Sequence, residues 1–139
     1  MSHKRVSQQG QVTDEVVQRL RESQRRLAVQ NYHDGKQHGR VWACKHADAA
    51  QLRRLREFLD HIGPDRKRYF SSYGHSAYSL GERLYFVMNP ENDGDRDAAR
   101  EFWDAGGDSG LLKAADPSTF LRGFAVGAVA VWAAVEKKL

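Results

Sequence analysis

Apolar residues along this chain recur at intervals of three and four positions, and no segment shows the clear two-residue alternation of a half-exposed strand. This period is typical of helices that bury one face, so the sequence predicts an all-α fold of five or six helices. A short strand over 84–88 is an alternative to a helix there. The expected helices cover about residues 13–46, with a break or kink near 30–34 as an alternative, then 48–62, 77–88, 95–105 and 117–137.

Capping residues mark the predicted helix boundaries. Asp48 is followed three positions later by Gln51, which is the spacing of a capping box. Asp116 precedes Pro117, and the two suit the N-cap and first position of the last helix. The first helix has only a thin apolar stripe, formed by Val16, Val17, Leu20 and Leu27.

The last expected helix is the most apolar part of the chain. Its longest apolar stretch, residues 124–135, is shorter than the roughly 20 residues that a membrane span needs, so we interpret it as the central helix of a core. Residues 1–12 are polar and are expected to form a flexible tail, which leaves 13–139 as a single helical domain. With no secretory signal at the start, we expect a cytoplasmic protein without a membrane role.

Two segments, at 32–39 and 120–127, share the spacing of an aromatic residue, a glycine three positions later and a second glycine after four more. On a helix these positions share one face. A glycine inside a helix costs about 0.5–1 kcal/mol relative to alanine, and close approach of two backbones usually offsets that cost. We therefore expect the two helices to cross in the core, with separate packing sites or coincidence as alternatives. The helix-packing residues are Tyr32, Gly35, Gly39, Phe120, Gly123 and Gly127.

Composition suits a folded protein, because 40% of the 139 residues are hydrophobic and 29% are charged. The net charge of +4 is unevenly placed. Residues 1–70 hold 15 Lys and Arg against 8 Asp and Glu, whereas 71–139 hold 7 against 10. This polarity favours an acidic partner for the N-terminal half, and nucleic acid is the commonest candidate. Solvated helix faces are the alternative interpretation.

The strongest signal for nucleic acid is a basic and aromatic stretch after residue 65. Cations neutralise phosphates, and exposed rings stack on unpaired bases. Basic clusters at 19–26, 53–56 and 66–68 would form one surface if the helices that carry them are neighbours. We predict contacts to the RNA or DNA backbone without sequence readout by Arg53, Arg54, Arg56, Arg66, Lys67 and Arg68, with Tyr69 and Tyr73 on bases or in packing.

Metal ligands are sparse. Zinc needs three or four convergent ligands, and no HExxH-type motif is present. The alternating aspartates at 93–97 lack the glycine and the bidentate glutamate that a calcium loop needs, so helix capping explains them better. We expect no metal and no cofactor. The candidates considered for zinc are His33, Asp34, His38 and His46.

Signals for a nucleophile are also weak. The stretch 74–78 comes near to a G-x-S-x-G elbow but has Tyr78 in place of the second glycine. Cys44, the single cysteine, excludes an internal disulfide and is expected to be a buried, inert thiol. We therefore expect a protein that is not an enzyme.

The sequence-based interpretation is a non-catalytic helical subunit or adaptor of a larger assembly, whose basic half contacts nucleic-acid backbone non-specifically. Three tryptophans and the glycine faces supply what tight protein interfaces use, and self-association is compatible with them. The first alternative is a protein-binding module of the inhibitor, immunity or antitoxin kind with no nucleic-acid role. The second is a small metal- or histidine-dependent enzyme that uses residues 33–46.

Overall fold

The computed structural model describes residues 2–70, 77–105, 111 and 114–139, without the side chains of 2–9, 67, 77 and 78. Every regular element in these ranges is helical, which confirms the predicted all-α class. The helices are α1 (Ser2–Lys45), α2 (Ala49–Ile62), α3 (Arg66–Tyr69), α4 (Ala77–Met88), α5 (Arg96–Asp104) and α6 (Pro117–Val135), with 3₁₀ turns at Gly63–Asp65, Pro90–Asn92 and Glu136–Lys138.

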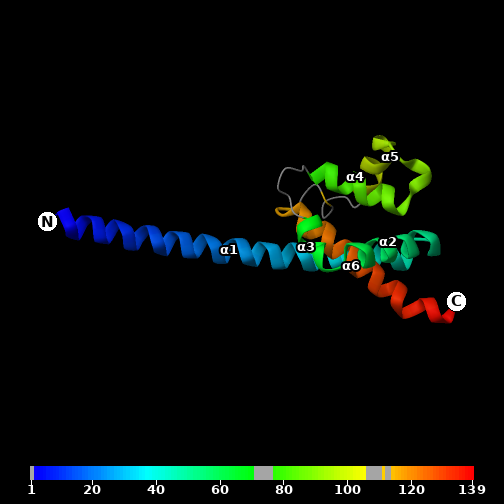
Figure 1. Ribbon diagram of the computed structural model, residues 1–139, viewed down its shortest axis with the longest axis horizontal. Helices are drawn as coiled ribbons and strands as arrows, with labels where there is room; N and C mark the ends of the chain where they lie inside the picture. The colour runs from blue at the N-terminus through cyan, green and yellow to red at the C-terminus, as the bar shows by residue number, and fades with distance from the viewer. Residues whose placement is uncertain (1, 71–76, 106–110, 112–113) are drawn as a thin grey trace.

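The first helix is one continuous rod. α1 begins at Ser2, so residues 2–12, which were expected to form a flexible tail, are helical. The break considered near 30–34 is absent, and the Asn31 side chain there donates a hydrogen bond to the Leu27 carbonyl at 2.7 Å. Residues 10–30 of α1, hereafter the arm, are exposed or nearly so and project from the body that the other helices form (Figure 1).

The predicted capping residues act as expected. Asp48 accepts a hydrogen bond from the Gln51 amide at 2.7 Å, and the Gln51 side chain accepts one from the Asp48 amide at 2.9 Å. Asp116 caps α6, and Asp95 caps α5 through the amide of Ala98. The segment 84–88 lies within α4, so the alternative of a strand is wrong.

α1 and α6 meet through their glycines. A Cβ atom added at Gly35 would overlap the carbonyl oxygen of Phe120, and one at Gly39 would overlap that of Phe124. Conversely, a Cβ at Gly123 or Gly127 would overlap the carbonyl oxygen of Tyr32 or Lys36, respectively. Each glycine Cα therefore faces a carbonyl of the other helix, which is the arrangement of Cα–H···O contacts between close helices.

The two helices run parallel at this crossing, because the contacting residue numbers rise together on both. Gly35 meets Phe120 and Gly39 meets Phe124, one turn further along each helix. The reciprocal contacts of Gly123 and Gly127 have the same form with the helices exchanged. The two copies of the sequence pattern are thus related by a local two-fold axis that runs between the helices.

Two side-chain interactions fix the register of this crossing. Asn31 is buried on α1, and its side-chain oxygen accepts a hydrogen bond at 3.3 Å from the backbone amide of Asp116, the N-cap of α6. The guanidinium of Arg122 lies 5.2 Å from the ring centroid of Tyr32, within range of a cation–π contact. The start of α6 is thereby tied to the point where the arm enters the body.

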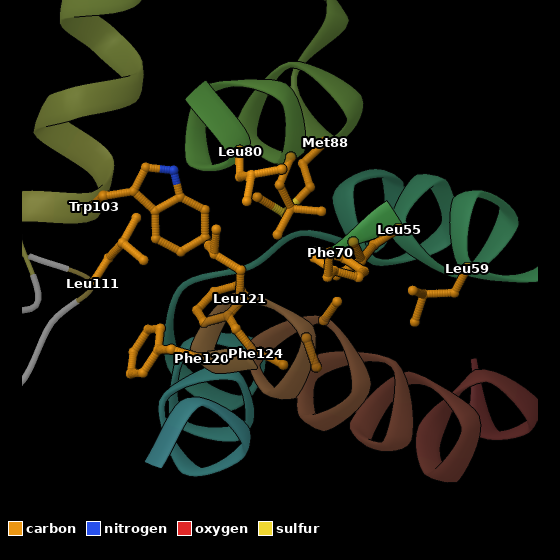
Figure 2. Close-up of a cluster of buried hydrophobic side chains, with 14 of the residues drawn as sticks. Leu55, Leu59, Phe70, Leu80, Met88, Trp103, Leu111, Phe120, Leu121 and Phe124 are labelled. Atoms are coloured by element: carbon orange, nitrogen blue, oxygen red, sulfur yellow. The ribbon is translucent and has the colours of Figure 1, made fainter. Parts of the chain in front are cut away.

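The rest of the body packs on the other side of α6. α2 and α4 contact α6 and each other, and α5 packs on α4. Figure 2 shows Leu121 at the centre of this cluster, with Leu55 of α2 and Met88 of α4 directed toward it. Trp103 of α5 closes the cluster and donates a hydrogen bond of 2.7 Å from its indole N–H to the Gly81 carbonyl.

α6 together with the turn that follows it, Pro117–Lys138, is long and apolar enough by length and composition to cross a membrane, with a mean hydropathy of 1.5. This hydropathy is the mean over an 18-residue window of the segment, and half of the window is buried against the rest of the chain. Since the central helix of a folded core meets the same criterion, this composition agrees with the place of α6 in the body.

The glycine contacts predict an inverted response to alanine. Alanine favours a helix over glycine by about 0.5–1 kcal/mol. At Gly39 we nevertheless expect Gly39→Ala to lower the free energy of unfolding by about 1–3 kcal/mol, because the new methyl group forces α1 and α6 apart. Gly127→Leu should destabilise further. Urea unfolding followed by circular dichroism measures both.

Gly10→Ala is the matched control, because nothing lies within 4 Å of a Cβ added at Gly10. It should leave the midpoint unchanged or raise it. A Gly39→Ala protein as stable as the parent would show that the two backbones are not in close contact.

Candidate functional site

Two of the arginines predicted to bind phosphate take part in contacts within the body. Arg54 donates a hydrogen bond of 3.1 Å to the Met88 carbonyl and lies 3.5 Å from a carboxylate oxygen of Glu91. Arg56 forms an ion pair with Glu136 and lies 5.9 Å from the ring centroid of Trp132. These side chains join α2 to the end of α4 and to the C-terminal turn, so they are less available for phosphate.

The other arginines predicted to bind phosphate take part in fewer contacts within the body. Arg53 and Arg68 are exposed, and within the described part of the chain neither forms an ion pair. Arg66 is half-buried, and its Nε has no hydrogen-bond partner among the described residues. Tyr73 and the side chain of Lys67 lie outside the described residues.

Tyr69 packs within the body. Its ring lies 4.9 Å from that of Phe58 and 5.2 Å from that of Phe70, both measured between centroids and both edge-to-face. Burial raises the pKa of its phenol above the usual value, and the nearby Arg83 cation partly opposes the shift. Of the two roles considered for Tyr69, base stacking and packing, these contacts favour packing.

The three basic clusters lie on separate elements. Residues 19–26 belong to the arm, which Figure 1 shows on one side of the body, whereas 53–56 lie on α2 at the other side. Residues 66–68 lie on α3, which contacts α2. The predicted phosphate-binding residues of the body therefore lie on two contacting helices, α2 and α3, whose exposed surface is hereafter the α2–α3 face, and the arm carries its own set of arginines.

The arm is the feature that the sequence reasoning missed as a site. Its apolar stripe lies in the open: Val16, Val17, Leu20 and Leu27 are 37%, 39%, 52% and 43% exposed. The sequence could have indicated an exposed arm through its narrow apolar stripe on a long helix, because helices that face a core have a broader apolar face.

A cavity of about 480 Å³ lies between α1, α5 and α6. Aromatic rings dominate its lining: the Trp42 ring lies 5.6 Å from that of Phe102 and 5.4 Å from that of Phe124, between centroids. His38 and His46 also line it, and the His38 ring lies 5.3 Å from that of Phe120. The size and apolar lining are within the range of small-molecule sites, and the polar side-chain groups of the lining residues are two imidazoles and two indole N–H groups, of which that of Trp103 is hydrogen-bonded to the Gly81 carbonyl.

The metal and nucleophile sites considered from the sequence are not assembled in the described part of the chain. No group of three or more His, Cys, Asp or Glu side chains there is arranged to hold a metal. Cys44 is exposed, so the expectation of a buried thiol is wrong; it lies on the outer face of α1 because residues 39 and 43 supply the inner face. Asp95 caps α5, and residues 74–76 of the elbow-like stretch lie outside the described residues.

Comparison of the chain with family models, with curated proteins and with solved structures finds no match in any of the three.

The environment of Tyr69 predicts a loss of stability at high pH. The pKa of this phenol is raised in the folded protein, so above the unfolded-state value of about 10 the unfolded chain loses a proton that the folded chain retains. The resulting contribution to stability is complete below that pH and declines as the pH rises through the folded-state pKa.

We expect Tyr69→Phe to keep the neutral-pH stability, because the ring contacts remain, and to show a smaller decline under alkaline conditions. Urea unfolding at neutral and alkaline pH tests this. An identical pH dependence in the parent and the variant would contradict the buried environment of the phenol.

Proposed function

We propose that this chain is a non-catalytic helical subunit of a larger assembly, which docks on a partner through its projecting arm and contacts nucleic-acid backbone with its basic N-terminal half. The observation that carries the proposal is the exposed apolar stripe on the arm. A helix that projects from a small body and leaves such a stripe in solvent gains stability when a partner covers it.

The nucleic-acid part rests on the α2–α3 face. Arg53 and Arg68 are exposed cations without ion pairs among the described residues, and the arm adds further arginines. Guanidinium groups on exposed helix surfaces suit phosphate contacts, and they carry no information about base sequence. Because Arg54 and Arg56 are held by carboxylates of the body, we assign the main role to Arg53 and Arg68.

A protein-binding module without a nucleic-acid role is the second candidate, and the same apolar stripe favours it. Capture of partners from a host lysate, divided into nuclease-treated and untreated halves, separates the two candidates. Partners that are lost after nuclease treatment support the nucleic-acid proposal. A stoichiometric protein that survives the treatment supports the protein-binding module.

The direct test is binding to a fluorescently labelled single-stranded oligonucleotide, followed by anisotropy at several salt concentrations. Affinity should fall steeply with salt, since each neutralised phosphate contributes about 0.7–0.9 to the slope of log K against log salt. The double variant Arg53→Gln/Arg68→Gln should bind more weakly at every salt concentration and lower that slope by about 1–2.

Lys137→Gln/Lys138→Gln is the matched control, because it removes the same charge from exposed lysines that belong to neither α2 nor α3. It should bind nearly as tightly as the parent. An affinity that does not change with salt, or equal losses in the two double variants, would refute phosphate binding by the α2–α3 face.

A further inference from the structure

The arm is a long helix that lacks the tertiary support of the body helices. Residues 10–30 extend over about 30 Å, and all of them except the partly buried Ala28 are exposed. Helices in proteins owe most of their stability to packing of an apolar face against other elements. A structure that covers the stripe would therefore stabilise the arm directly.

The stripe has the spacing of a coiled-coil seam. Thr13, Leu20 and Leu27 recur every seven residues, and Gly10, Val17 and Gln24 alternate with them at steps of three and four. This is the spacing of the a and d positions with which one helix packs on a single partner helix, and Val17, Leu20 and Leu27 are the apolar residues at these six positions. The seam is narrow, which favours one additional helix over a sheet or a broad core.

Charges beside the seam specify the partner and its direction. Asp14 and Arg21 occupy the same flanking position of successive heptads. When two such helices run antiparallel, residues at this position face each other across the seam, so Asp14 of one copy meets Arg21 of the other, twice by symmetry. In a parallel pair, Val16 of the other copy would flank Arg21 instead. The arm is thus complementary in charge to itself in the antiparallel direction.

We propose that the arm binds the arm of a second copy of this chain, as a two-stranded antiparallel coiled coil over residues 10–27. In this register Val17 packs against Leu20 of the second copy at the centre, and Thr13 lies opposite Gln24. At the ends, Leu27 lies opposite Gly10, beside the groove of about 560 Å³ between the arm and the N-terminus of α6. This inference rests on the proposed function, in which the arm is a docking surface, and it names the occupant.

The pairing would hold two bodies at opposite ends of a rod about 27 Å long. The α2–α3 faces of the two copies would then contact separate stretches of one nucleic acid or of two. Such bivalent attachment raises the overall affinity without any new contact at either face.

Sedimentation equilibrium of the full chain tests the pairing. The parent should be a dimer, and Leu20→Glu should be monomeric, because its carboxylate would lie in the seam. Val29→Glu is the matched control: Val29 is an exposed apolar residue on the arm, but nine positions from Leu20 it lies on the opposite side of the helix. This control should remain a dimer. A parent that is monomeric at its highest soluble concentration, or a dimeric Leu20→Glu, would overturn the proposal.

Charge exchange and cross-linking test the direction. Asp14→Arg and Arg21→Glu should each weaken the dimer, and the double exchange should restore it. Within one helix the two positions are about 10 Å apart, too far for a direct ion pair, so the recovery would report contact between two copies.

Cross-linking tests the same register independently. In a Cys44→Ser background, mixed Thr13→Cys and Gln24→Cys chains should form a disulfide that neither forms alone. Single variants that cross-link with themselves, or a double exchange that does not recover, would overturn the antiparallel register.

The same variants distinguish a failure of self-pairing from a failure of the proposed function. If the parent is monomeric, but Leu20→Glu loses a protein that the parent captures from a lysate, the arm docks on a different partner; self-pairing fails and the proposed function stands. If Leu20→Glu alters neither the oligomeric state nor the captured proteins, both fail. Near-ultraviolet circular dichroism of the tryptophans, which lie in the body, verifies that the variants remain folded.

Discussion

The close contact of the α1 and α6 backbones sets the arrangement of the other helices and of the arm. Four glycines remove the side chains that would otherwise separate the helices, and carbonyl oxygens of each helix face the glycine Cα atoms of the other. A contact of this kind tolerates little sliding or rotation, because any other residue at the interface would clash. It therefore sets the direction of α1 relative to the body.

The arm follows from this constraint. The glycine contacts of the crossing lie within residues 32–39 of α1, and the Asn31 side chain, which accepts a hydrogen bond from the N-cap of α6, marks its beginning. α1 continues beyond the N-terminus of α6, so the preceding turns have no helix beside them in the described part of the body (Figure 1). The apolar stripe is left in solvent for this geometrical reason, and the exposed stripe in turn motivates the proposed docking role.

The same architecture divides the arginines by role. Arg54 and Arg56 face the C-terminal end of α4 and the turn after α6, where carboxylates and an indole ring hold them. Arg53 is on the same helix but points to solvent, as expected one position away on a helical surface. The sequence suggested one basic surface if the helices that carry the three clusters were neighbours, whereas the packing of α2 separates cations that stabilise the body from cations that remain exposed to a partner.

Much of the fold could be predicted from local signals in the sequence. The three- and four-residue spacing predicted the helices, the pair Asp48 and Gln51 predicted the start of α2, and Asp116 with Pro117 predicted the start of α6. These signals are reliable because caps and helical periodicity depend on residues only a few positions apart. The glycine spacing also indicated which faces of α1 and α6 could approach closely.

The surroundings of each helix depend on contacts between segments that are distant in the sequence. Val16 and Leu20 have the spacing of a buried stripe, yet they are exposed because α6 begins too far along α1 to cover them. Cys44 is exposed and Tyr69 is packed against Phe58 for similar reasons, since burial depends on which distant helix arrives at each face. Local sequence signals were enough to place the helices and the faces that can pack, because they depend on residues a few positions apart. The crossing of α1 and α6 sets which of these faces are covered and which remain available to a partner, because it depends on segments about 90 residues apart in the sequence.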